Sequence, residues 1–307
     1  MTKEVREDLA KCAHVRFDEP MSAHTTLGVG GPADAFCDLE TIEELKNVMR
    51  LAVEHRLPYF FLGGGSNLLV QDGGIRGLVL RLGGDFKIYQ IGQDFGDEVL
   101  LEAGAAAHTP QLVRWSLEQG LQGMEVLAGV PGTIGGNVMM NAGTKLGCLA
   151  DLIDEITVLD RNAREMTMKA KSLRFEYRHL KLPSTACVLR AVFRLKRSAA
   201  LQGGPSLGDL LAKRRATQPV AEQSCGCVFK NPPKISAGQL IEESGLKGVR
   251  IGKVRISTLH GNFFINEGGA TAREIMVLIR LVKDRVKEAT GITLETEVVI
   301  VGEEKRR

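Results

Sequence analysis

The sequence predicts a mixed α and β protein of two or three domains, and three observations support this. The chain has 307 residues, which is more than one hydrophobic core usually serves. Segments with a helical period of apolar residues alternate with short apolar runs that are typical of strands. The 35 glycines gather in a few stretches and form no repeat, which indicates tight turns or backbone that approaches a ligand.

The composition is that of a globular protein with no strong preference for one class of partner. Hydrophobic residues make up 44%, charged residues 25%, and the net charge is +3. This small charge, with three tyrosines and one tryptophan, disfavours a nucleic-acid binder. The N-terminus lacks a signal-peptide core, and no apolar run reaches the roughly 20 residues that span a bilayer. We therefore expect a cytoplasmic protein, not attached to a membrane, whose cysteines are mostly thiols.

The first part of the chain reads as a small α/β unit with a glycine turn at its centre. A helix is predicted over 41–55, because Thr41 and Glu44 have capping-box spacing before an apolar stripe. Short buried strands are predicted on both sides of the glycine turn and after it, over 57–62, 68–70 and 78–82.

A second unit starts near residue 97, and a third part follows a polar break near 196–206. In the second unit, Thr109 and Pro110 open a helix that runs to about Gln119. Thr271 and Glu274 again have capping-box spacing. The elements expected here are strands over 97–104, 156–160, 187–195, 260–266 and 292–302, and helices over 206–216, 237–245 and 271–291.

The last predicted strand carries two carboxylates. Leu294 and Val298 fall on one face, and Glu295 and Glu297 on the other, because side chains alternate along a strand. A carboxylate between β-branched neighbours is partly desolvated, which raises its pKa.

Two glycine-rich loops are candidates for a cofactor site. The segment FLGGGSNLLV (61–70) is neither a P-loop nor a dinucleotide fingerprint, since it lacks the lysine of the first and the spacing of the second. Its consecutive glycines still expose backbone N–H groups that suit a pyrophosphate, although a tight turn without a ligand is an equal alternative. The second loop, GVPGTIGGNVMMNAG (129–143), favours the ligand, because two such loops can close around one extended dinucleotide.

The segment CGCVFKNPP (225–233) places two cysteines on either side of one glycine. A metal site, a disulfide, a redox pair and a proton donor are the alternatives. We expect no metal, since no second cysteine pair or suitably spaced histidines accompany Cys225 and Cys227. On an extended strand the two side chains point to opposite sides, so a disulfide between them is not expected.

Eight motifs together resemble the UDP-N-acetylenolpyruvoylglucosamine reductases, flavoenzymes of bacterial cell-wall precursor synthesis, in the shorter of two subtypes. The match covers roughly residues 20–302. The motifs are HTTLGVGGPADAF (24–36), FLGGGSNLLVQDGGIRGLVLRL (61–82), GMEVLAGVPGTIGGNVMMNAG (123–143), FEYRHL (175–180), KRRATQP (213–219), CGCVFKNPP (225–233), AGQLIEESGLKGVRIGKVRISTLHGNFFIN (237–266) and GITLETEV (291–298).

The resemblance implies an α+β fold with three domains. Residues 1–84 and 85–198 would form an FAD-binding module of the vanillyl-alcohol-oxidase (PCMH) type, and 199–307 a substrate-binding domain whose C-terminal strand carries Glu297. NADPH would reduce FAD. The flavin would then reduce the enolpyruvyl double bond of UDP-N-acetylglucosamine enolpyruvate to give UDP-N-acetylmuramate. We expect a monomer that acts on these small molecules.

The resemblance also implies roles for single residues. Arg178 would stabilise the charge that develops on the substrate, Cys227 would donate the proton where the family usually has serine, and Glu297 would support the enolate-like state. A thiol is a stronger acid than an alcohol, so the substitution preserves the role.

Further residues follow the family pattern for ligand contacts. Lys230, Asn231, His260 and Asn262 would face the substrate, whereas the basic cluster of KRRATQP reads as a solvated helix face. The positions expected to bind FAD are Gly63, Gly64, Gly65, Ser66, Asn67, Leu68, Gly129, Pro131, Gly132, Thr133, Gly135, Gly136, Asn141 and Ala142.

Two rival functions remain at this level. One is another FAD-linked oxidoreductase of the same architecture that acts on a different small substrate. The other is a non-catalytic sensor of flavin or nucleotide sugar.

Overall fold

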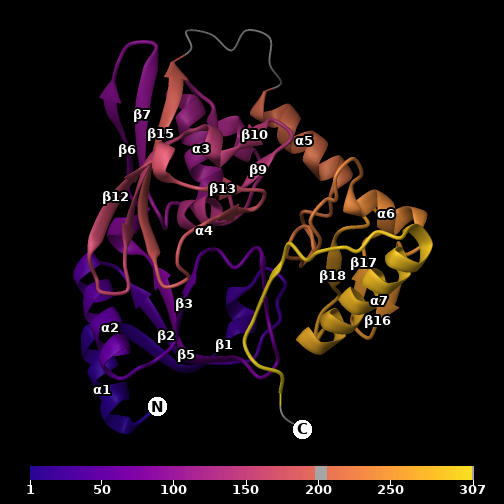
Figure 1. Ribbon diagram of the computed structural model, residues 1–307, viewed down its shortest axis with the longest axis horizontal. Coiled ribbons are helices and arrows are strands. Elements are labelled where there is room, and N and C mark those ends of the chain that lie inside the picture. The colour runs from indigo at the N-terminus through magenta and orange to yellow at the C-terminus, as the bar shows by residue number, and fades with distance from the viewer. Residues whose placement is uncertain (198–205, 306–307) are drawn as a thin grey trace. The chain divides into compact units, whose positions relative to one another are not determined.

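The computed structural model describes residues 1–197 and 206–305, and its helices and sheets confirm an α+β protein (Figure 1). The contacts divide the chain into two compact units. Unit 1 comprises Met1–Arg16, Ala35–Gly64 and the described part of Gly77–Leu211. Unit 2 comprises Phe17–Asp34, Gly65–Arg76 and the described residues from Ala212 onwards. The three-domain division stays a prediction, and the polar break expected near 196–206 lies largely on 198–205, outside the described residues.

The elements are as follows. The helices are α1 (Lys3–Cys12), α2 (Ile42–Glu54), α3 (Thr109–Glu118), α4 (Ile134–Met139), α5 (Leu207–Thr217), α6 (Ala237–Glu243) and α7 (Ala272–Thr290). The strands are β1 (His14–Pro20), β2 (Pro32–Leu39), β3 (Tyr59–Leu62), β4 (Leu68–Val70), β5 (Ile75–Leu82), β6 (Tyr89–Asp94), β7 (Glu98–Gly104), β8 (Leu121–Gln122), β9 (Gly143–Thr144), β10 (Gly147–Cys148), β11 (Ile153–Leu159), β12 (Glu165–Lys169), β13 (Phe175–Glu176), β14 (His179–Leu180), β15 (Cys187–Arg197), β16 (Arg250–Ile251), β17 (Val254–Ile256), β18 (Phe264–Asn266) and β19 (Val299–Val301).

The main sheet of unit 1 is antiparallel. Its strand order is β12-β11-β15-β7-β6, with β8 beside β15. Val99, Leu101 and Ala103 of β7 point into a core that also contains residues of α3 and α4. Figure 1 shows these two helices against the same sheet. The alternation therefore leaves Glu102 on the opposite face of the sheet.

A second sheet has the order β1-β2-β5-β3, and β3 runs parallel to β5. The helix α2 begins after Thr41, whose hydroxyl accepts from the Glu44 N–H while the Glu44 carboxylate accepts from the Thr41 N–H. The predicted capping box is confirmed, and the predicted apolar stripe is buried.

In β2, Asp38 lies between two guanidinium groups. The Arg16 Nη1 lies 2.7 Å from one carboxylate oxygen of Asp38 and the Arg81 Nη2 lies 2.6 Å from the other. Burial of this carboxyl acts to raise its pKa, but the hydrogen bond from Arg16 and the charge of Arg81 outweigh it, so the pKa is lowered.

This pKa shift links stability to pH. Because the pKa of Asp38 in the folded protein lies below its unfolded value of about 3.9, the stabilisation is present above that pH and is lost as the pH falls through the folded pKa. We expect Asp38→Asn to lower the free energy of unfolding at pH 7 by about 1–3 kcal/mol. Denaturant unfolding at pH 7 and at acid pH measures this. The exposed control Asp97→Asn should change stability by less than about 0.5 kcal/mol, and an equal loss in both variants would contradict the assignment.

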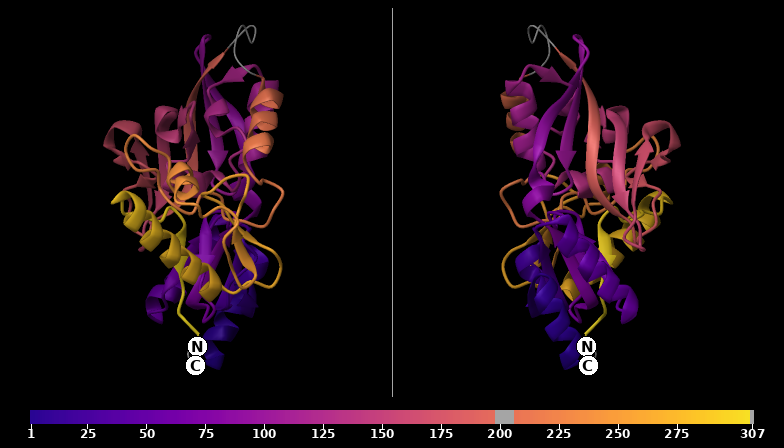
Figure 2. Two further views of the ribbon diagram at one scale, coloured as in Figure 1. Left: turned by 90° about the vertical axis from the view of Figure 1, so that its right-hand side faces the viewer. Right: turned by 90° about the vertical axis from the view of Figure 1, so that its left-hand side faces the viewer.

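Unit 2 contains the three-stranded sheet β16-β17-β18, against which α7 packs (Figure 2). The predicted capping box of Thr271 and Glu274 opens α7, and Gly291 ends it at φ 75°. Leu278, Ile279 and Val282 of this helix are buried in a core shared with α6 and the sheet. A parallel pair, β4 with β19, completes the unit.

The last predicted strand is shorter than expected. Only Val299–Val301 forms a ladder, although the alternation predicted for the preceding residues is confirmed. Leu294 and Val298 are buried and Glu295 is exposed. The reason is that residues 294–298 run beside 228–230 and meet them at a single bridge, Phe229 with Thr296.

Among the described residues, no helix is both long enough and apolar enough to span a bilayer.

Candidate active site

The two glycine-rich loops lie against each other within unit 1. A Cβ added to Gly64 would lie 2.6 Å from the Cα of Gly132, and one added to Gly63 would lie 2.9 Å from the Oγ1 of Thr133. A side chain at Gly63 or Gly64 would therefore collide with the second loop. The expected proximity of the two loops is confirmed for these residues.

These loops also offer backbone donors. Within the described chain, the amide N–H groups of Gly64, Gly132 and Thr133 donate to no protein acceptor. Gly64 is exposed, and Gly132 and Thr133 are half-buried. Unsatisfied N–H groups grouped on an accessible backbone suit the oxygens of a pyrophosphate.

Other residues of the second loop have structural tasks. The Gly135 N–H donates to Ala105 O over 2.8 Å, and a Cβ at Gly135 would lie 2.8 Å from the Cβ of Ala105. The side chain of Asn141 donates to Glu176 O over 3.0 Å and accepts from the Ala150 N–H over 3.0 Å. Asn141 therefore ties the loop to β13, the strand that precedes Arg178.

The glycine contact gives a direct test of cofactor binding. We expect Gly64→Ala to weaken FAD binding by at least about tenfold, or ~1.4 kcal/mol, because the new methyl group forces the Gly132 backbone away. Titration of the apoprotein with FAD measures this. The control Gly208→Ala adds a methyl group in α5 with ordinary clearance, so it should bind FAD like the wild type. Equal affinity in both variants would contradict the role of Gly64.

The rest of the first loop belongs to unit 2, since the boundary between the units falls after Gly64. Gly65 has φ 63°, and a Cβ there would overlap the His24 carbonyl. The Thr26 N–H donates to Gly65 O over 3.1 Å, and the Thr26 hydroxyl donates to Ser224 O over 2.6 Å. The Asn67 side chain donates to Glu297 O over 3.2 Å. This half of the loop is thus tied to the segments that carry Cys227 and Glu297.

Three extended segments of unit 2 bring the backbones around Cys227 and Glu297 side by side. Cys227 pairs with Phe263 through one bridge, and Phe229 pairs with Thr296 through another. The Glu297 N–H donates to Val228 O over 2.8 Å. Residues 227–229 therefore lie between the segment after Gly261 and the segment that carries Glu297.

The backbone at Gly226 corrects one expectation. The segment was predicted to be an extended strand that separates the side chains of Cys225 and Cys227, but Gly226 has φ 75°. A left-handed residue turns the chain, so the alternation of a strand does not apply. Cys225 is 3% exposed and Cys227 is half-buried. Burial, with smaller effects of Cys227 and Glu297, raises the pKa of the Cys225 thiol to about 12.

Asn262 and His260 hold the segment 227–229 in place through buried hydrogen bonds. Asn262 is 1% exposed; its Oδ1 accepts from the Phe229 N–H over 2.9 Å and its Nδ2 donates to Phe229 O over 2.8 Å. Asn262 therefore holds the backbone of Phe229, two residues after Cys227, and its expected contact with the substrate stays a prediction. His260 Nδ1 accepts from the Asn262 N–H over 3.2 Å. Burial, and then Lys247, lowers the pKa of His260, so its ring is neutral at pH 7.

Lys230 and Asn231 follow the same segment. The Lys230 Nζ lies 3.4 Å from a Glu295 carboxylate oxygen, on a surface where both side chains are at least one-third exposed. A pair so exposed contributes little to stability, so the lysine can exchange its partner for an anionic ligand. Asn231 Oδ1 accepts from the Ala237 N–H over 3.0 Å at the start of α6.

Arg178 lies in unit 1, at the turn of the β13–β14 hairpin. It has φ 58°, a left-handed conformation that is uncommon for a residue with a side chain. Its guanidinium lies 5.2 Å from the centre of the Tyr177 ring. Such strained backbone conformations often occur at functional positions.

Sequence reasoning missed Arg214. The KRRATQP segment reads as a solvated helix face, but Arg214 is half-buried in α5, unlike the exposed Lys213 and Arg215. Burial lowers the pKa of its guanidinium, and its charge interacts with Cys227. A cation beside a sulfur stabilises negative charge on that sulfur. In the sequence, only the helical period could have set Arg214 apart. Its neighbours Lys213 and Arg215 are also basic, so the period cannot be recognised there.

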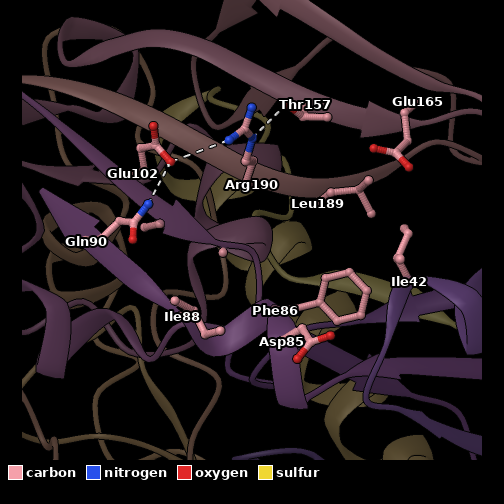
Figure 3. Close-up of a pocket in the computed structure, with 12 residues that line it drawn as sticks. Ile42, Asp85, Phe86, Ile88, Gln90, Glu102, Thr157, Glu165, Leu189 and Arg190 are labelled. Atoms are coloured by element: carbon pink, nitrogen blue, oxygen red, sulfur yellow. Dashed lines mark hydrogen bonds and ion pairs between the residues drawn. The ribbon is translucent and has the colours of Figure 1, made fainter. Parts of the chain in front are cut away.

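A separate cavity of about 380 Å³ occurs in unit 1 and contains none of the predicted site residues. It lies over the outer face of the main sheet, where Figure 3 shows Arg190 between Glu102 and Thr157. Within the described residues, no cluster of three or more histidine, cysteine, aspartate or glutamate side chains can hold a metal ion.

Comparisons with known proteins identify the family. A model of an FAD binding domain matches residues 33–169, and a model of the UDP-N-acetylenolpyruvoylglucosamine reductase C-terminal domain matches 218–301. A UDP-N-acetylenolpyruvoylglucosamine reductase of Syntrophus aciditrophicus is 39% identical over 302 residues, which is 98% of this chain and 96% of that protein. The chain belongs to the UDP-N-acetylenolpyruvoylglucosamine reductase family.

Other reductases are similar to this chain over nearly its whole length. The reductase of Pelobacter propionicus is 41% identical over 288 residues, which cover 94% of this chain and 95% of that protein. The crystal structure of the reductase from Thermus caldophilus has a TM-score of 0.75 and 37% identity, and it covers 94% of this chain and 98% of that one. The predicted α+β fold with an FAD-binding module is confirmed.

Proposed function

We propose that this chain is an NADPH-dependent flavoenzyme that reduces the enolpyruvyl double bond of UDP-N-acetylglucosamine enolpyruvate to UDP-N-acetylmuramate, a peptidoglycan precursor. The relatives named above are reductases, and their similarity extends over nearly the whole length of this chain. The observation that carries the proposal is the segment 227–229, which holds a thiol beside the backbone that carries Glu297.

The glycine loops fit FAD. The N–H groups of Gly64, Gly132 and Thr133 would bind its diphosphate, and the closeness of the two loops leaves that backbone without covering side chains. When bound, FAD would supply the hydride chemistry by which NADPH reduces the substrate double bond.

The chain's own residues have three tasks in this reaction. Arg178 would bind the substrate carboxylate with two parallel hydrogen bonds, and so stabilise the negative charge that spreads into it. Cys227 would give its proton to the carbon next to that carboxylate, and Arg214 would stabilise the resulting sulfur anion. Glu297 would hydrogen-bond to the enolate-like state, and Lys230 would pair with the diphosphate.

The visible spectrum of the purified protein tests the proposal. We expect a yellow protein that NADPH bleaches and that regains its colour when the enolpyruvyl substrate is added anaerobically. Chromatography should then show UDP-N-acetylmuramate in an amount equal to the oxidised NADPH. A protein that takes up no flavin, or whose bleached form persists with the substrate, would contradict the proposal.

The same experiment separates the rival functions. A sensor of flavin or nucleotide sugar would bind its ligand without turnover. Another FAD-linked oxidoreductase would be bleached by NADPH but would not be reoxidised by the enolpyruvyl sugar. We expect a monomer in the cytoplasm, which gel filtration of the holoenzyme and cell fractionation check.

A further inference from the structure

We propose that Cys225 and Cys227 form a site of reversible oxidation, at which a peroxide converts the two thiols into a disulfide across Gly226. This inference concerns the dithiol itself, and its effect on turnover rests on the proposed function. Two features of unit 2 carry it: the turn of the chain at Gly226 and the unequal exposure of the two sulfurs.

The spacing of the two cysteines keeps them near the range of a disulfide. Residues two apart lie at most about 7 Å apart between their Cα atoms, close to the upper limit for a disulfide. Gly226 has φ 75°, so the chain bends there and does not hold the side chains on opposite sides. A Cβ added at Gly226 would meet no atom within 4 Å, so space remains for the chain to adjust as the bond forms.

The two thiols differ in exposure, and this difference indicates which one reacts with peroxide and which one forms the disulfide afterwards. Cys227 is half-buried, so it is the more accessible of the two cysteines to a molecule as small as hydrogen peroxide. The neighbouring guanidinium of Arg214 stabilises an anionic sulfur, the form that attacks a peroxide. Cys225 is 3% exposed and, with a pKa raised to about 12 by burial, remains a thiol at neutral pH.

The chemistry balances in two steps. The sulfur of Cys227 attacks hydrogen peroxide, the O–O bond breaks, and a sulfenic acid and water form. The sulfur of Cys225 then attacks the sulfur of Cys227, and the hydroxyl group leaves with the Cys225 proton as a second water. Two thiols are oxidised and one peroxide is reduced. A disulfide in so small a ring is strained and therefore easily reduced by a dithiol.

Cys12 and Cys37 likewise combine a half-buried thiol with a buried one, but burial and the charge of Asp8 raise the pKa of Cys12 and so disfavour the anion that attacks a peroxide. Cys187 is buried, and Cys148 is half-buried with its thiol donating to Asp151 over 3.5 Å. All six cysteines are thiols in the structure.

Mass spectrometry of the FAD-loaded protein provides the test. Cleavage after Arg215 and Lys230 releases one tryptic peptide, 216–230, which holds Cys225 and Cys227 and no other cysteine. After treatment of the holoenzyme with hydrogen peroxide and alkylation, we expect this peptide to have lost two hydrogen atoms and to take up no alkylating agent. Reduction with dithiothreitol should restore both sites of alkylation.

Two variants make the test specific. In Cys225→Ser the resolving thiol is missing, so a second peroxide should oxidise the sulfenic acid of Cys227 to a sulfinic acid. The same peptide should then gain two oxygen atoms that dithiothreitol does not remove. Cys148→Ser should behave like the wild type. A wild-type peptide that gains oxygen, or that joins a different cysteine, would overturn the proposal.

The readout is independent of turnover. If the holoenzyme forms the disulfide but reduces no enolpyruvyl sugar, the proposed function fails and the oxidation site stands. If turnover is observed and peroxide leaves the peptide unchanged, the oxidation site fails and the proposed function stands. Where both stand, the loss of activity should equal the fraction of disulfide and should reverse with dithiothreitol.

Discussion

Cys227→Ala should lose turnover by about 10²- to 10⁴-fold, the usual contribution of a positioned general acid. The variant keeps both glycine loops, so its flavin spectrum and its bleaching by NADPH should resemble those of the wild type. The defect should therefore appear in reoxidation by the substrate. Stopped-flow absorbance measures the two half-reactions separately. Wild-type activity in the alanine variant would exclude Cys227 as the proton donor.

The matched control is Cys227→Ser, which restores a hydroxyl donor and should remain active. A thiol is intrinsically the stronger acid and forms an anion at a lower pH than an alcohol does. The serine variant should therefore keep its activity at alkaline pH, where the wild type loses its proton donor. Cys225→Ser should retain wild-type turnover, because Cys225 is buried and has no place in the proposed proton transfer.

Arg178→Ala should lower kcat/KM by about 10²- to 10³-fold, the loss seen when one group that stabilises a developing oxyanion is removed. Arg178→Lys keeps the charge but loses the two-pronged geometry, so it should fall between the alanine variant and the wild type. Steady-state kinetics with FAD content measured in parallel separates catalysis from cofactor loss. Arg178 is at φ 58°, and alanine tolerates this conformation no better than arginine, so the backbone strain is unchanged.

The control for this prediction is Arg174→Ala in the same region. Arg174 is exposed and its carbonyl, which the substitution keeps, accepts from Lys181. Its kinetics should match the wild type. If Arg174→Ala and Arg178→Ala lose the same activity, the effect belongs to the stability of the hairpin and the proposed role of Arg178 fails.

Local signals in the sequence predicted much of the fold. Two capping boxes placed the starts of α2 and α7, because a threonine and a glutamate three residues apart satisfy each other's backbone. The predicted length of the final strand was wrong. Tertiary pairing with β4 decides where the ladder of this strand begins. Propensity does not report such long-range pairing.

The site shows the same division. The glycine loops and Cys227 stand out in the sequence because their composition is unusual. Arg214 does not, since one half-buried arginine in a basic run looks like its exposed neighbours until the helix is packed. The turn at Gly226 and the inward-facing side chain of Asn262 were also invisible, because both depend on what the rest of unit 2 places around them.

The pairing of β4 with β19 bears on how the protein is made. Leu68 and Val299 are neighbours in this parallel pair, and the Gln71 side chain donates to Gly302 O over 2.9 Å. During synthesis, Leu68–Val70 must therefore wait for more than two hundred further residues before gaining its partner strand. Such distant contacts close slowly, and nascent chains with unpaired strand edges are prone to aggregation. Chaperone demand on the ribosome should thus persist until Val299–Val301 has been synthesised.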